Sequence, residues 1–225
     1  MMARPKFPKS LNEHNTSKTV HKIGQDMRGI VPYKFNNCGF RADVDYDEKE
    51  KNAGCYFGHA FTSAVGIEWQ NSYAAKVSHK LGAKAYNFSQ GCVGVDNKEI
   101  IRTAIEVANH KTFMPKFFII QFCDLTRRYN PKNGALTFES DTGENVKEFT
   151  KYFDLLEKNL DEANIKWLFF GCDFELYHTV SDRIMKHKNC LIWNPAFVDK
   201  ILYGMPGEKW HHIISYGILN KFQND

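Results

Sequence analysis

The sequence lacks the features that mark several large classes of protein. Its six cysteines include no Cys-x-x-Cys pair, and several lie within apolar runs, which argues against a zinc site and favours free thiols over a disulfide framework. The longest apolar run, residues 117–122, is too short to cross a bilayer, and the N-terminal stretch MMARPKFPKSLNEHN has no apolar signal-peptide core. We therefore expect a soluble, cytoplasmic protein without a metal site and without membrane association.

Strong charge bias and phosphate-binding motifs are also missing. The chain has 30 basic and 26 acidic residues, a net charge of +4, which argues against nucleic acid as a partner although residues 1–36 are locally basic. The turn after the first expected strand contains neither GxxxxGK[ST] nor GxGxxG. This excludes a nucleotide site of the P-loop type or a dinucleotide site at that turn.

The composition predicts one folded domain preceded by an arm. A chain of 225 residues with 43% hydrophobic content can bury one sizeable core. Residues 1–36 are polar and show no sustained period of 2 or 3.6, which predicts an extended arm that could also contact a protein partner. The folded domain is expected over residues 37–225.

Short apolar runs alternate with amphipathic stretches along this domain. Strands are expected near residues 53–57, 83–89, 117–122, 167–172 and 191–193, and helices near 69–81, 100–108, 146–160, 178–187 and from about 208. Long helical connections imply right-handed crossovers, so the pattern predicts an α/β fold, a three-layer α/β/α sandwich with a five-stranded parallel sheet. A ligand crevice is expected at the carboxyl ends of the strands. In the last helix, Ile213, Ile214, Gly217 and Ile218 are predicted to face inward.

Five sequence blocks carry a resemblance to a known family. They occur in the order NNCGFR (36–41), GHAFTSAVG (58–66), NFSQGCVGVDN (87–97), FFIIQFCDLTRR (117–128) and MPGEKWHH (205–212). Together they resemble the SGNH (GDSL-like) hydrolase superfamily, and more narrowly a branch common in bacteria and their viruses. The resemblance implies a flavodoxin-like fold and serine-dependent hydrolysis of acyl esters without a metal or cofactor.

The family's catalytic positions fall on residues that cannot perform this chemistry. The resemblance puts the serine nucleophile at Ala60, the catalytic aspartate at Leu202 and the catalytic histidine at Met205, while the oxyanion glycine is retained as Gly91. A hydroxyl needs an adjacent base and oxyanion donors to attack a carbonyl, so acyl transfer by this route has no first step here.

Two functional hypotheses follow. One is a pseudoenzyme that binds a small molecule or glycan, without turnover, in a crevice around Gly58, His59, Ala60 and Gly91. The alternative is an ester hydrolase for a carbohydrate or small acyl ester, in which the family positions fall elsewhere or Ala60 is an engineered inactivation. Thr62 and Ser63 are substitute nucleophiles under the second hypothesis and helix caps under the first.

Other polar residues near the expected crevice have two interpretations each. His59 could serve the site or donate to a loop carbonyl. Arg127 and Arg128 could clamp a carboxylate or phosphate, or form a surface pair with Asp124. His211 is expected to pack inside the last helix, although it could line the binding site.

One further candidate is a thiol. Cys92, which follows Gly91, is either a nucleophile or an inert buried thiol.

Overall fold

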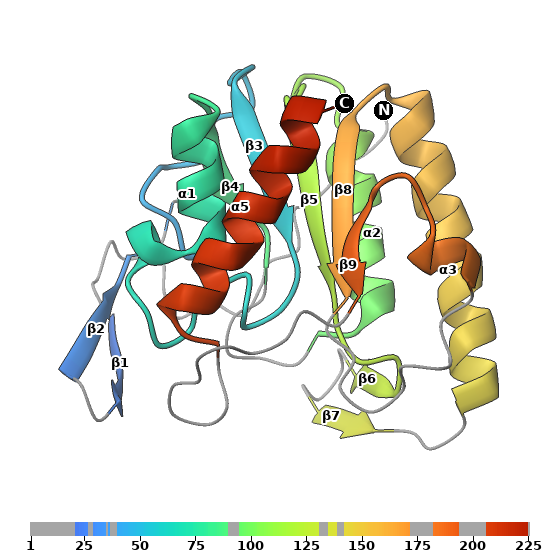
Figure 1. The fold of residues 1–225 in the computed structure, drawn as a ribbon, viewed down its shortest axis with the longest axis horizontal. Coiled ribbons are helices and arrows are strands. Elements are labelled where there is room, and N and C mark those ends of the chain that lie inside the picture. Colours follow the sequence, from blue (N-terminus) through green and yellow to red (C-terminus); the bar gives the residue numbers. More distant parts are fainter. Residues whose placement is uncertain are drawn as a thin grey trace, which may run out of the picture.

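The chain folds into a central sheet with helices on both faces (Figure 1). The computed structural model describes residues 21–26, 29–34, 36, 40–89, 95–130, 135–138, 142–171, 182–193 and 206–224. The strands are β1 (His21–Asp26), β2 (Gly29–Tyr33), β3 (Ala53–Phe57), β4 (Lys84–Asn87), β5 (Phe117–Phe122), β6 (Arg127–Asn130), β7 (Ala135–Phe138), β8 (Lys166–Gly171) and β9 (Cys190–Trp193). The helices are η1 (Trp69–Asn71), α1 (Tyr73–Lys80), α2 (Asn97–Ala108), α3 (Thr142–Glu162), α4 (Asp182–Met185) and α5 (Glu208–Asn224).

The central sheet has five strands in the order β4-β3-β5-β8-β9, and all of its pairs are parallel. Counted along the chain, this is the order 2-1-3-4-5 of flavodoxin-like folds. The predicted three-layer α/β/α fold is therefore confirmed. In this topology the strand order reverses between β3 and β5, and the crevice outside the carboxyl ends of these two strands is where such folds bind ligands.

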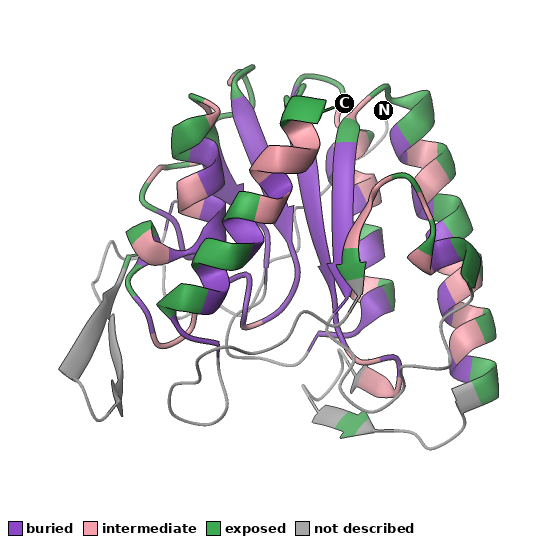
Figure 2. Cartoon of the chain, viewed as in Figure 1, coloured by how far each residue is buried: buried purple, intermediate pink, exposed green. Residues whose placement is uncertain are grey.

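Each face of the sheet is covered by its own hydrophobic core. Helices α1 and α5 pack on one face, and α2, α3 and α4 pack on the other (Figure 1). Strand β5 is buried along its whole length, with Phe118, Ile120 and Phe122 on the α2 side and Phe117 and Ile119 on the α5 side. Figure 2 shows the same burial across the sheet and on the inner faces of the helices. Burial on both faces explains why β5 reads as a continuous apolar run.

Helix α5 is rotated relative to the prediction. Ile214 and Ile218 are buried as expected, and Gly217 lies against Leu191, but Ile213 is 50% exposed, so its predicted inward position is wrong. The inner face instead includes Trp210 and two polar residues, which are His211 and Ser215.

Two antiparallel hairpins accompany the sheet, and the sequence patterns predicted neither of them. Strands β1 and β2 pair within the stretch expected as an extended arm, of which residues 1–20 lie outside the described residues. Strands β6 and β7 pair directly after the turn that follows β5. The second hairpin therefore places Arg127 and Arg128 beside the carboxyl edge of the sheet.

Candidate functional site

The turn after β3 is held from inside by Arg41. This buried guanidinium donates hydrogen bonds to the carbonyl oxygens of Ser63 (2.9 Å), Ala64 and Ile67 (2.5 Å). Ala64 has a positive φ of 55°, which is costly for a residue with a side chain, so the turn needs this support. Arg41 is the last residue of the sequence block NNCGFR, whose pattern does not indicate this role.

Gly58 lets the chain leave β3 in close contact with β5. A Cβ built on Gly58 would lie 2.2 Å from Thr62 Oγ1 and 3.0 Å from Gln121 Cβ. No real contact is that short, so the glycine permits a close approach that any side chain would prevent. Gly58 is thus a structural residue of the expected crevice.

We expect Gly58→Ala to lower the free energy of unfolding by about 2–3 kcal/mol, because the added methyl overpacks a buried turn. Urea unfolding of the variant measures this cost. In a Thr62→Ala background the clashing hydroxyl is absent, so the same change should cost less. Additive costs in this double-mutant cycle would contradict the explanation from the contact with Thr62.

The Thr62 hydroxyl is part of a buried hydrogen-bond chain. It donates to Gln121 Oε1 on β5 (2.5 Å) and accepts from the Tyr73 hydroxyl on α1 (2.8 Å). The backbone N–H of Tyr73, the first residue of α1, donates to His211 Nδ1 on α5 (3.2 Å), and the two rings stack at 5.7 Å. The chain connects α5, α1 and β5. His211 is buried and therefore has the packing role expected for it.

The Ser63 hydroxyl belongs to a second buried network. Its oxygen lies 2.6 Å from the Ser89 hydroxyl, and Asn87 Oδ1 accepts from the Ser89 backbone N–H (2.9 Å). Asn87 Nδ2 donates in turn to the Arg41 carbonyl (2.9 Å). Neither Thr62 nor Ser63 caps a helix as predicted, because residues 60–66 form turns and α1 begins only at Tyr73, with Ser72 as its cap.

His59 is placed at the switch point of the sheet and is 3% exposed. Within the described part of the chain neither of its ring nitrogens has a hydrogen-bond partner, so the predicted bond to a loop carbonyl is wrong. The ring packs against Phe61, with 4.5 Å between the ring centroids. Burial, and secondly the positive charge of Arg127, lower its pKa from 6.5 to about 3. His59 is therefore neutral at physiological pH.

Two hydrogen bonds connect the carboxyl end of β5 to the first residue of α2. Asn97 Nδ2 donates to the Cys123 carbonyl (2.9 Å), and the Cys123 N–H donates to Asn97 Oδ1 (2.8 Å). Asp124 Oδ1 accepts from the N–H (2.8 Å) and hydroxyl (2.6 Å) of Thr126. The carboxylate of Asp124 thus stabilises the turn into β6, and the ion pair predicted between Asp124 and the arginines is not part of the described structure.

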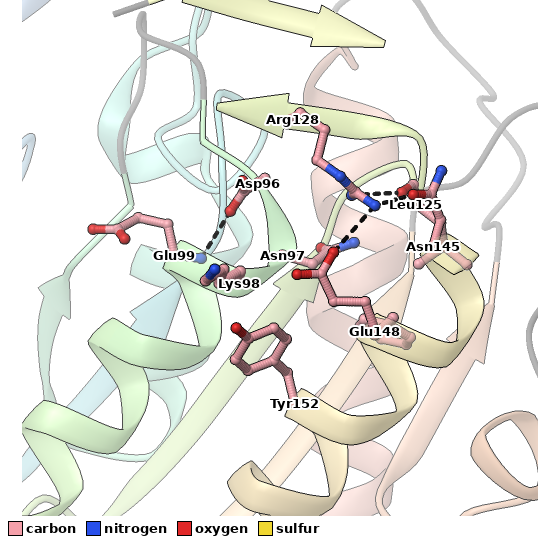
Figure 3. Close-up of a pocket in the computed structure, with 10 residues that line it drawn as sticks. Asp96, Asn97, Lys98, Glu99, Leu125, Arg128, Asn145, Glu148 and Tyr152 are labelled. Carbon is pink, nitrogen blue, oxygen red and sulfur yellow. Dashed lines mark hydrogen bonds and ion pairs between the residues drawn. The ribbon is translucent and has the colours of Figure 1, made fainter. Parts of the chain in front are cut away.

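The side chains of Arg127 and Arg128 point in different directions, because successive side chains alternate between the two faces of a strand. Arg128 bonds Asn145, lies 3.3 Å from Glu148, and lines a polar pocket of about 450 Å³ between α2 and α3 (Figure 3). Arg127 acts on His59 instead, through the charge that lowers its pKa. The two side chains therefore act at different places, which does not fit the predicted joint clamp by both arginines.

Several predicted positions lie outside the described residues. These are Gly91, Cys92, Leu202 and Met205. Ala60, at the expected nucleophile position, is partly buried and packs against the α1 and α5 core. Over the residues that are described, no three His, Cys, Asp or Glu side chains gather as metal ligands, and no helix has the length and apolarity of a membrane span.

A scan against models of protein families and a search of curated proteins each found no match to this chain.

Proposed function

We propose that the chain is an SGNH-like protein that binds a small-molecule or glycan ligand at the carboxyl ends of β3 and β5 and does not hydrolyse it. The single observation that carries this proposal is the arrangement of polar groups around Ala60. The side chain at the nucleophile position is a methyl group, and the hydroxyls in the same turn, of Thr62 and Ser63, are bonded to Gln121, Tyr73 and Ser89. No imidazole accepts a proton from either hydroxyl within the described structure.

The position of His59 supports the same conclusion. A general base needs a hydroxyl to deprotonate and usually a carboxylate to orient it. Within the described residues His59 has neither partner, and a cation is the charged group that perturbs it. Loss of a triad member typically costs ~10⁴-fold or more in rate, so what remains is the capacity to bind.

A serine-directed fluorophosphonate probe and p-nitrophenyl acetate test this proposal. We expect no stoichiometric labelling and no turnover above that of buffer containing an equal concentration of albumin. Labelling at Ser63 or Thr62 that disappears in Ser63→Ala or Thr62→Ala would overturn the proposal and establish an ester hydrolase.

We also expect Ala60→Ser to remain inactive in both assays, because the new hydroxyl would meet no base. Circular dichroism checks that the variant is folded. If this one substitution produced hydrolysis, a histidine and a carboxylate must reach residue 60, and the chain would be an inactivated enzyme.

A further inference from the structure

Buried nitrogens of His59 and Arg127, at the switch point of the sheet, have no hydrogen-bond partners among the described residues. These are both ring nitrogens of His59 and the Nε of Arg127. The two side chains come from separate elements, since His59 follows β3 and Arg127 begins β6 after β5, but β3 and β5 are neighbours in the sheet. Their turns therefore lie over the same crevice.

Unpartnered buried donors are rare in folded proteins because each costs free energy. The unpartnered donors of His59 and Arg127 lie in the turns after neighbouring strands, and Arg127 is permanently charged. We take this as an indication that a bound ligand supplies the acceptors. The three nitrogens are themselves buried, whereas Ala60 and Arg127, taken as whole residues, are partly exposed.

We propose that His59 and Arg127 together bind one small oxyanion, a carboxylate or phosphate group of the ligand. A guanidinium has donors only, and it matches the oxygens of such a group. This inference rests on the proposed function, since it names the chemistry of the ligand held at the same place.

The charges around the site agree with this assignment. The positive charge of Arg127 lowers the pKa of His59. It also acts to lower the pKa of the buried Cys123 thiol, whereas Asp96 and Asp124 act to raise it. The two carboxylates have other tasks, since Asp96 Oδ1 caps α2 and Asp124 Oδ1 binds Thr126. A bound oxyanion would therefore supply the negative charge facing His59, and would favour its protonated form.

Titration calorimetry with acetate and with inorganic phosphate, at pH 6 and pH 8 and constant ionic strength, tests the inference. We expect saturable binding of at least one anion at both pH values, because the guanidinium of Arg127 keeps its charge across this range. The comparison of acetate with phosphate decides which of the two groups the site takes.

The matched variants are Arg127→Gln and Arg128→Gln. Loss of a charge-assisted hydrogen bond should weaken anion binding about tenfold or more in Arg127→Gln. Arg128→Gln removes the same charge from the next residue, whose side chain lies in the separate pocket of Figure 3. The affinity for the anion should then change by less than about twofold, because solvent screens a charge outside the site. His59→Phe removes the ring N–H donor and keeps a ring against Phe61, so it should also weaken anion binding while the fold is retained.

Absence of saturable binding of both anions, or an equal loss in the two arginine variants, would overturn the inference. Either result leaves the proposed function standing if the hydrolysis assays stay negative. Conversely, turnover of p-nitrophenyl acetate would overturn the proposed function without affecting a measured anion site.

Discussion

Replacing Arg41 by methionine is expected to lower the free energy of unfolding by about 3–5 kcal/mol, since three buried carbonyl oxygens lose charged donors and each loss costs roughly 1–3 kcal/mol. Methionine keeps much of the apolar volume of arginine, so the cost reports mainly the lost hydrogen bonds. Urea unfolding, followed by circular dichroism, gives the difference directly. Because the three carbonyls belong to the turn that carries Ala60, we also expect weaker amide-exchange protection of residues 60–67 than in the unmodified chain.

Arg102 provides the control for this substitution. It is an exposed arginine that pairs with Glu99 and Glu106 on α2, with 47% of its side chain exposed. Arg102→Met should cost less than about 1 kcal/mol, as expected for surface ion pairs. Similar losses in Arg41→Met and Arg102→Met would show that Arg41 does not support the turn.

Acid is expected to destabilise the protein strongly between pH 6.5 and pH 5. His59 and His211 are buried, and burial as the main cause, with nearby cations, lowers the pKa of each from 6.5 to about 3. Below pH 6.5 the unfolded chain gains protons that the folded chain does not, so stability falls as the pH falls toward 3. Each histidine should contribute a loss of about 1.4 kcal/mol per pH unit, so the two together cost roughly 4 kcal/mol at pH 5.

Urea unfolding at pH 7.5, 6.5 and 5, in buffers without carboxylate or phosphate, measures this dependence. His211→Asn retains an acceptor for the Tyr73 N–H, and His59→Phe retains a ring against Phe61, and each should remove about half of the pH dependence. His79→Gln, at an exposed position near the end of α1, should leave it unchanged. An unchanged slope in both of the first two variants would contradict the assignment to these histidines.

The sheet could be predicted because its strands are buried on both faces. Strands β3 and β5 read as short apolar runs, and amphipathic helices separate them, so parallel pairing and three layers follow from general rules. The β6–β7 hairpin could not be predicted in this way. It lies in a polar stretch where pairing depends on tertiary context, and its first strand, RRYN, carries no apolar alternation.

The predicted orientation of α5 was wrong for a different reason. Apolar residues occur on more than one side of this helix, including the exposed Ile213 and Tyr216, so the hydrophobic stripe alone was ambiguous. The actual inner face contains His211 because its ring nitrogen accepts the first N–H of α1. This hydrogen bond depends on where α1 lies in the folded protein. The periodicity of apolar residues within α5 carries no information about that position.

The sequence indicated that a ligand site would lie at the carboxyl ends of the strands. It did not indicate that Arg41 would hold the turn after β3. At the expected ends, His59 after β3 and Arg127 after β5 follow strands that are neighbours in the sheet. Arg41 was missed because a charged residue between Phe40 and Ala42 gives no sign of which carbonyls it will bind. Long-range hydrogen bonds of this kind are specific to the folded structure.

The bond between Tyr73 and His211 joins elements that are 138 residues apart in the sequence. During synthesis, every strand of the central sheet leaves the ribosome before His211 does, because α5 follows β9. A nascent chain halted before that point would have the sheet sequence but no acceptor on α5 for the first amide of α1. The bond between α1 and α5 would then form only after translation has passed His211, so a nascent chain halted earlier should have α1 without this contact.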